Sequence, residues 1–141
     1  GCEQLSWNDI QIASTIFAVK PGDGSAREQA ASCQRVLGAG ANIVTEYATK
    51  RYRSNCINWG IVPFTLDKDT KFDYQPGDFV FVKGIRDAIV NGRETIPAKV
   101  ITQKGVEDIT LYVKGLTADE KTIICEGCLM NYYAALNRKN K

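Results

Sequence analysis

The stretch GDGSAREQA at residues 22–30 constrains the fold most, because it joins two patterns that need different backbone geometries. Before it, residues 10–19 pass from alternating to continuously apolar, which is typical of a strand entering a covered sheet. After it, apolar residues recur at helical spacing over residues 30–37. Glycines on both sides of Asp23 permit a sharp turn between the two elements. The stretch therefore predicts a strand, turn and helix junction.

Two interpretations of this junction stay open at the level of local pattern. Ser25 followed by Glu28 is the pattern of a capping box, in which the serine caps the helix and the glutamate reaches back to the cap; a cap is worth about 1 kcal/mol and needs no function. Alternatively, Ser25 lies where the first helical N–H groups point outward, with Arg27 in the same turn, and this combination attracts an anion. The local pattern by itself favours the structural interpretation.

The segments that follow repeat the alternation of strand and helix. A short strand is expected over residues 41–45, a helix from about Tyr47 to Trp59 with Gly60 as its stop, and a further strand over 61–66. This alternating order of three strands and two helices predicts parallel strands joined by right-handed crossovers.

The second half of the chain is typical of antiparallel structure. Short strands are expected over residues 79–83, 96–102 and 109–113, with a tight turn at Asn91-Gly92. Thr117 and Glu120 repeat the capping-box pattern, so one or two helices should close the chain near Leu136. The predicted fold class is α/β, with parallel strand-helix crossovers in front and an additional, mostly antiparallel β layer behind. With 141 residues, 44% of them hydrophobic, residues 1–141 are expected to form a single domain with one core.

The absence of histidine from the 141 residues removes the commonest general base and the commonest zinc ligand. Every Ser/His or Cys/His catalytic pair is excluded with it. A net charge of +2 is ordinary, and the basic clusters at 50–53 and 137–141 are short, which favours solvated faces over a nucleic-acid site.

Five cysteines in scattered positions do not form the even framework of a small secreted domain. We therefore expect free thiols and a soluble protein in the cytoplasm, since no apolar run reaches the ~20 residues that span a bilayer. Cys125 and Cys128 have the spacing of half a metal site or of a redox pair, but they lie in an apolar helical run. Core packing is the favoured interpretation of this pair, and no metal site is expected in the chain.

Two motifs resemble the C-terminal swivelling domain of the aconitase family of hydro-lyases, which is related to the isopropylmalate isomerase small subunit. Residues 22–30 are similar to the family fingerprint Gly-x-Gly-Ser-Ser-Arg-Glu-x-Ala, and residues 55–64, NCINWGIVPF, are similar to its helix-to-strand passage. The likeness is close from about residue 16 to 66, looser in the β layer, and returns in the C-terminal helices. It implies a swivelling β/β/α domain.

The resemblance implies roles for the fingerprint residues. Ser25 would be the base that removes a proton from the carbon next to a carboxylate, and Arg27 would bind a substrate carboxylate, with Gly24 and Ala26 beside the substrate. The substrate would be a 2-hydroxy di- or tricarboxylic acid, most simply citrate or isocitrate. Ala26 stands where the family usually has a second serine, and Gln29 replaces a frequent histidine.

A helix N-terminus alone cannot activate such a serine. A helix N-terminus stabilises a negative charge by about 0.3–2 kcal/mol, and one pKa unit corresponds to 1.36 kcal/mol. It would therefore lower the pKa of the serine hydroxyl by about one unit. The rest must come from cations and preorganised donors in a closed site. In the family these belong to a 4Fe-4S cluster and residues on other domains. The resemblance therefore implies either an excised part of a larger hydratase or a small subunit, inactive alone and partnered by iron-sulfur domains.

Two non-enzymatic functions remain as alternatives. The turn at Gly24, Ser25 and Arg27 would also suit a module that only binds an anion or a partner's carboxylate. RNA binding is less favoured, because Lys50, Arg51 and Arg53 surround only one aromatic residue, whereas single-strand binding normally adds a row of stacked rings.

Overall fold

The computed structural model describes residues 6–139. A short 3-10 helix (η1, Trp7–Asp9) precedes the first strand. The strands are β1 (Ser14–Ala18), β2 (Ala39–Val44), β3 (Val62–Thr65), β4 (Phe79–Phe81), β5 (Thr95–Thr102) and β6 (Gly105–Tyr112). The helices are α1 (Arg27–Val36), α2 (Lys50–Asn58), α3 (Ile85–Val90), α4 (Ala118–Glu126) and α5 (Leu129–Lys139).

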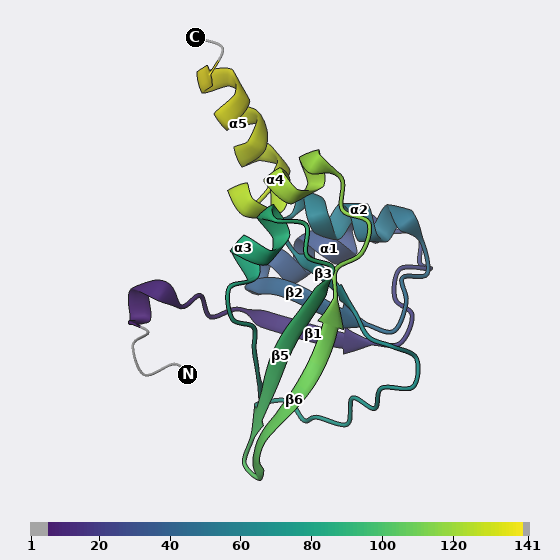
Figure 1. The fold of residues 1–141 in the computed structure, drawn as a ribbon. Helices are drawn as coiled ribbons and strands as arrows, with labels where there is room; N and C mark the ends of the chain where they lie inside the picture. Colours follow the sequence, from purple (N-terminus) through teal and green to yellow (C-terminus); the bar gives the residue numbers. More distant parts are fainter. Residues whose placement is uncertain (1–5, 140–141) are drawn as a thin grey trace.

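All six strands lie in one mixed sheet of order β1-β2-β3-β6-β5-β4. The pairs β1–β2 and β2–β3 are parallel, whereas β3–β6, β6–β5 and β5–β4 are antiparallel. The two halves meet at the single pair Thr65–Tyr112, so the long β5–β6 hairpin diverges from the parallel strands (Figure 1). The α/β class is confirmed, with the expected antiparallel layer continuing the parallel sheet.

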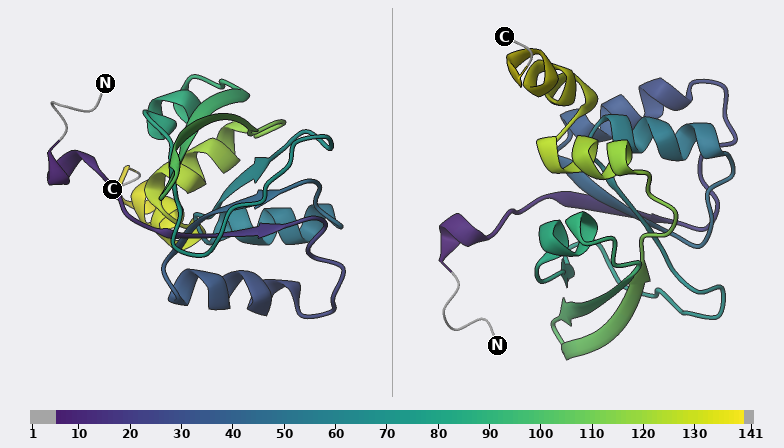
Figure 2. Two further views of the ribbon diagram at one scale, coloured as in Figure 1. Left: turned by 90° about the horizontal axis from the view of Figure 1, so that it is seen from below. Right: turned by 45° about the horizontal axis from the view of Figure 1, so that its top comes forward.

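Two hydrophobic clusters cover the two faces of β2 and β3. One lies beneath α1 and α2 and contains buried Ala31, Tyr52, Cys56 and Ile61. The other lies between the parallel strands and the antiparallel half (Figure 2), and its buried members are Ile43, Phe64, Leu66, Ala88, Ile96, Ala98, Leu111 and Val113. Strand β1 is the edge of the sheet and has no buried residue, so the prediction that it enters a covered sheet is wrong. Strand β5 alternates exposed and buried residues over 95–101, as a strand with one covered face must.

Helix α3 is the α-helix of the described residues that the sequence pattern did not predict. It occupies residues 85–90, and Asn91 is its C-cap, so Asn91-Gly92 ends a helix and does not join two strands. The hairpin turn lies instead at 102–105, between β5 and β6. Six residues are too few for a helical period to stand out, and Ala88 and Ile89 supply the only buried positions of α3.

The C-terminal helices follow the expected pattern at their start. Thr117 and Glu120 form the predicted capping box at α4, and Gly127, in the left-handed region at φ 91°, separates α4 from α5. Helix α5 packs on α4 and extends away from the sheet (Figures 1 and 2). Cys125 and Cys128 flank this break and are half-buried, so the prediction that they pack in the core is wrong.

Gly60 provides a test of how α2 and α4 are packed together. Its φ is +70°, and a Cβ there would lie 1.9 Å from the Gly127 carbonyl oxygen. We expect Gly60→Ala to lower the free energy of unfolding by about 2–5 kcal/mol, because it combines left-handed strain with a backbone clash. Gly38→Ala is the matched control: φ is +86° but no atom lies within 4 Å. Its expected cost is about 1–2 kcal/mol. Urea denaturation of both variants checks the difference, and equal losses would contradict the packing.

Candidate functional site

The candidate site lies at the carboxyl end of the parallel strands, where the loops after β1 and β2 lie side by side (Figure 1). Backbone hydrogen bonds join these loops: the amide of Thr45 donates to the Ala18 carbonyl, that of Glu46 to Val19, and that of Ala48 to Pro21. Ligands of open α/β sheets bind outside this edge. The turn that carries Ser25 is thus in the position that the fold class favours.

Ser25 lies just outside α1, and the predicted capping box is absent. The helix begins at Arg27, its N-cap is Ala26, and no side chain caps it. The Glu28 carboxylate accepts hydrogen bonds from the Asn55 side-chain amide and from Trp59 Nε1 instead of reaching back to the cap. Two donors on the neighbouring helix α2 have replaced the local partner.

The missing cap leaves polar groups available at the surface. Ser25, Gly24 and Ala26 are exposed, and among residues 6–139 the Ser25 hydroxyl has no hydrogen-bond partner. The first N–H groups of an α-helix have no acceptor within the helix. An unpaired hydroxyl therefore lies next to the unpaired donors of an uncapped helix.

Arg27 lies on the same turn as Ser25 and is half-buried. Its Nε donates to the Gly22 carbonyl at 2.9 Å, and its Nη2 lies 3.5 Å from the Asp23 carbonyl oxygen. The Nε and Nη2 side of the guanidinium thus contacts the main chain of the turn. Ser25 and Arg27 therefore lie on one turn, with Ser25 exposed and Arg27 half-buried.

Thr49 is a site residue that the sequence analysis did not identify, and Gly22, noted there as a turn glycine, supports the site through its carbonyl. Thr49 Oγ1 donates to the Gly22 carbonyl at 3.0 Å and accepts from the Tyr52 amide as the N-cap of α2. Gly22 has φ +98°, and a Cβ there would lie 2.5 Å from the Tyr52 ring. A threonine just before a helix is a typical N-cap, and this pattern could have identified Thr49. It was missed because the helix was expected to begin at about Tyr47, which would put Thr49 inside it. A Cβ at Gly24 would meet nothing within 4 Å.

Charged side chains surround this edge. Glu46 forms ion pairs with Lys20 and with Lys68, the latter at 3.8 Å, and together they join the loops after β1, β2 and β3. The hydrogen bond from Lys20 lowers the pKa of the Glu46 carboxyl and raises that of the Lys20 ammonium. Both lysines are exposed and the Glu46 side chain is 39% exposed, so each pair contributes little stability.

The basic cluster at 50–53 is not an exposed array. Tyr52 is 2% exposed and packs in the core, so it offers no ring for base stacking. Arg53 Nη2 donates to the Lys114 carbonyl at 2.8 Å and its Nη1 lies 3.5 Å from Glu120, which ties α2 to α4. Only Lys50 and Arg51 of this cluster are exposed, which weakens the RNA-binding alternative.

The cysteines do not form a cluster site. Cys33, Cys56, Cys125 and Cys128 are free, as expected, and Cys2 lies outside the described residues. Within residues 6–139, no three His, Cys, Asp or Glu side chains are grouped so that they could hold a metal ion. The described residues therefore do not fit an iron-sulfur cluster.

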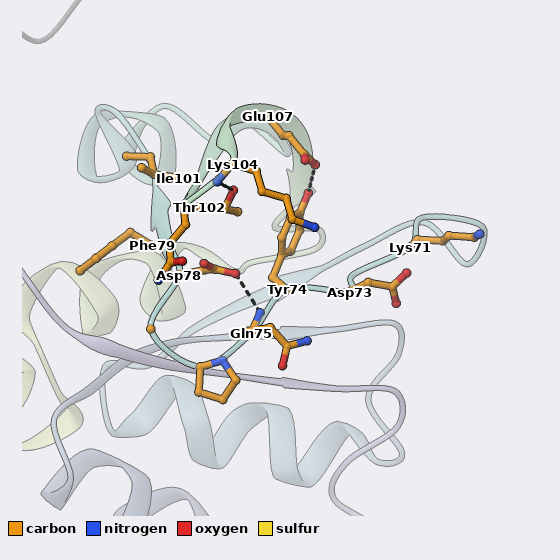
Figure 3. Close-up of a pocket in the computed structure, with 13 residues that line it drawn as sticks. Lys71, Asp73, Tyr74, Gln75, Asp78, Phe79, Ile101, Thr102, Lys104 and Glu107 are labelled. Atoms are coloured by element: carbon orange, nitrogen blue, oxygen red, sulfur yellow. Dashed lines mark hydrogen bonds between the residues drawn. The ribbon is translucent and has the colours of Figure 1, made fainter.

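A separate cleft of about 720 Å³ lies between the loop before β4 and the β5–β6 hairpin (Figure 3). Tyr74 donates its hydroxyl to Glu107 across this cleft, and Phe79 and Ile101 expose apolar surface beside it. None of its lining residues comes from the Ser25 turn.

Sequence similarity to known proteins identifies the family of this chain. Residues 4–69 match the model of the aconitase C-terminal domain, a span that contains the Ser25 turn and the 55–64 passage. The chain carries an aconitase C-terminal domain. The resemblance noted from the two motifs is therefore confirmed.

Curated proteins of the same family match over more of the chain. A putative mitochondrial aconitate hydratase of Emericella nidulans is 32% identical over 112 residues, which cover 78% of this chain and 14% of that protein. A 3-isopropylmalate dehydratase small subunit of Metallosphaera sedula is 36% identical, covering 72% and 56% respectively. The methanogen homoaconitase small subunit of Methanocaldococcus jannaschii is 31% identical, covering 81% and 62%. The matched region of this aconitase-family chain thus spans about one seventh of the hydratase and little more than half of each small subunit.

No helix within residues 6–139 has the length and apolar character needed to cross a membrane.

The environment of Cys56 leads to a prediction about thiol reactivity. Cys56 is fully buried, its sulfur accepts from the Asn42 side-chain amide at 3.4 Å, and burial raises the pKa of the thiol to about 11. Because the thiolate is the reactive form, Cys56 should not react with an aromatic disulfide reagent at pH 8, whereas exposed Cys33 should react readily. Raising the pH to 9 should leave Cys56 unreactive, since its thiol stays protonated below its pKa. Labelling followed by peptide mapping checks this, and rapid native labelling of Cys56 would contradict its burial.

Proposed function

We propose that this chain is the substrate-binding and base-supplying part of an aconitase-like hydro-lyase that dehydrates and rehydrates a 2-hydroxy di- or tricarboxylic acid. Family membership supports the class of reaction. The observation that carries the assignment to this chain is the exposed, unpaired Ser25 hydroxyl beside the uncapped first turn of α1. Citrate and isocitrate are the first substrates to test.

The proposed roles follow the positions of the side chains. Ser25, in its deprotonated form, takes a proton from the carbon next to a substrate carboxylate, and the electron pair of that C–H bond forms the C=C bond as the bond to the substrate hydroxyl breaks. The leaving hydroxyl takes a second proton from an acid that the partner supplies, and departs as water. Arg27 holds a substrate carboxylate through the N–H groups that its contacts with the turn leave available, because a guanidinium presents five donors in a fixed fork. The main chain at Gly24 and Ala26 is exposed, and the open space at Gly24 lets a ligand approach closely.

The site needs a partner to become active. The described residues do not fit an iron-sulfur cluster, so in this proposal the 4Fe-4S cluster that the family implies belongs to the partner. The helix terminus supplies only a small part of the stabilisation that a serine base needs. We propose that residues 1–141 act as one swivelling unit, either joined to the iron-sulfur domains in one polypeptide or bound to a large subunit. The small-subunit relatives support this arrangement, and the four free thiols support a reducing compartment such as the cytoplasm.

Substrate choice depends on what surrounds the turn. Ala26 lacks the hydroxyl that the family usually places there, so one donor to the substrate is missing. The relatives carry three different substrate names, those of aconitate, isopropylmalate and homoaconitate enzymes. A panel of citrate, isopropylmalate and homocitrate, assayed with the assembled enzyme, separates these possibilities.

Ser25→Ala is the direct test of the proposed base. We expect kcat for cis-aconitate hydration by the assembled enzyme to fall by a factor of about 10²–10⁴, because a positioned base contributes that much. The temperature of unfolding should not change, since the Ser25 hydroxyl bonds to nothing in the described chain.

The matched control is Ser32→Ala within α1. The Ser32 hydroxyl donates to the Gln29 carbonyl, and its loss should not affect kcat. Undiminished activity of Ser25→Ala would instead favour a non-catalytic module that only binds an anion.

Arg27→Lys tests the carboxylate clamp. Lysine keeps the charge but loses the fork, and it also loses the bond from Nε to the Gly22 carbonyl. We expect KM to rise by about tenfold or more, since bonds between charged groups contribute about 1.5–3 kcal/mol. Steady-state kinetics of the assembled enzyme measures the effect, with the exposed Arg93→Lys as the control. An unchanged KM would exclude Arg27 as the clamp.

A further inference from the structure

Glu28 connects the two helices that flank the candidate site. Its Oε1 accepts from Trp59 Nε1 at 2.6 Å, and its Oε2 accepts from the Asn55 side-chain amide. Asn55 lies in the second half of α2, and Trp59 is the C-cap of that helix. One carboxylate in the first turn of α1 therefore uses both of its oxygens to bind α2.

This bridge compensates for the missing cap. The N-cap Ala26 makes no side-chain bond, so the first turn of α1 lacks the usual local anchor. Before the turn, the Gly22 carbonyl is held by Arg27 Nε and by Thr49 Oγ1. After the turn, Glu28 is held by α2. Segment 23–27, which contains exposed Ser25 and half-buried Arg27, is thus anchored at each end.

The chemistry of the carboxylate argues against a direct role in binding substrate. A free carboxylate next to Arg27 would repel an anionic substrate and compete for the guanidinium. The two donors from α2 engage both oxygens and direct them toward the neighbouring helix. Glu28 therefore shapes the site without needing to touch the substrate.

We propose that Glu28 is a positioning residue: by binding Asn55 and Trp59 it fixes the first turn of α1, and with it the positions of Ser25 and Arg27. This inference rests on the proposed hydro-lyase function and adds a third fingerprint residue with a defined role. It also assigns a role to Trp59, whose indole N–H extends the bridge to the end of α2.

The test uses the assembled enzyme with Glu28→Ala, Glu28→Gln and the matched control Gln29→Ala. Glu28→Ala removes both acceptors, and we expect kcat to fall by a factor of about 10–100, because small misplacements of reacting groups are costly. Glu28→Gln should keep most of the activity. Its amide oxygen can accept from Trp59, and the Asn55 amide can turn round to accept from its nitrogen. Gln29→Ala, an exposed neighbour in the same turn, should behave as wild type.

A second readout separates positioning from general stability. Hydrogen exchange of the peptide covering residues 22–31 should speed up in Glu28→Ala and not in Glu28→Gln, while exchange in β5 and β6 stays unchanged. Trp59→Phe removes one of the two bonds, and it should give a smaller fall in kcat with a smaller rise in exchange. This milder variant keeps the test decisive even where Glu28→Ala does not fold.

The possible outcomes are distinct. If Ser25→Ala abolishes activity while both Glu28→Ala and Trp59→Phe keep wild-type kcat and exchange, the positioning role is overturned and the proposed function stands. If Glu28→Gln loses as much activity as Glu28→Ala, the negative charge matters and the hydrogen-bonded bridge does not. If Ser25→Ala keeps full activity, the proposed function itself fails.

Discussion

The carbonyl of Gly22 is the contact on which the candidate site depends. It accepts from Arg27 Nε and from Thr49 Oγ1, so one acceptor joins the loop after β1, the start of α1 and the start of α2. The arrangement requires a positive φ and no Cβ at this position, because the Tyr52 ring lies where a side chain would be. A single glycine thereby determines how the loop passes over the end of the sheet.

The elements with a strong local period could be predicted from the sequence. The parallel strands, α2 with its glycine stop and the capped start of α4 all follow from patterns of apolar residues and caps within a few positions. Helix α3 could not, because six residues are too short for a helical period to be recognised. The joining of the two half-sheets depends on one pair, Thr65 with Tyr112, that lies far apart in the sequence.

The candidate site shows the same division between local and long-range information. Ser25 lies just outside α1 and Arg27 is its first residue, and the roles that the fingerprint implies for them stay predictions. The capping box predicted for Glu28 was wrong. The local pattern indicated Ser25, three residues away, as its partner, whereas Asn55 and Trp59 come close to Glu28 only because α1 packs against α2. Thr117 and Glu120 have the same spacing, and there the capping box does form. Sequence spacing alone cannot distinguish the two cases, because the competing donors come from another helix.

The two helix starts differ in what satisfies their backbone donors. At α4 the side chains satisfy the free backbone donors, and the result is a stable terminus. At α1 no side chain caps the corresponding donors, which lie beside an unpaired hydroxyl. The turn is held instead by Arg27 and Thr49, which bind the Gly22 carbonyl, and by Glu28, which binds α2. An anion that binds at α1 therefore meets groups that no internal partner has to release. The absence of a cap, which costs about 1 kcal/mol in an ordinary helix, leaves this terminus ready to receive negative charge without a prior rearrangement.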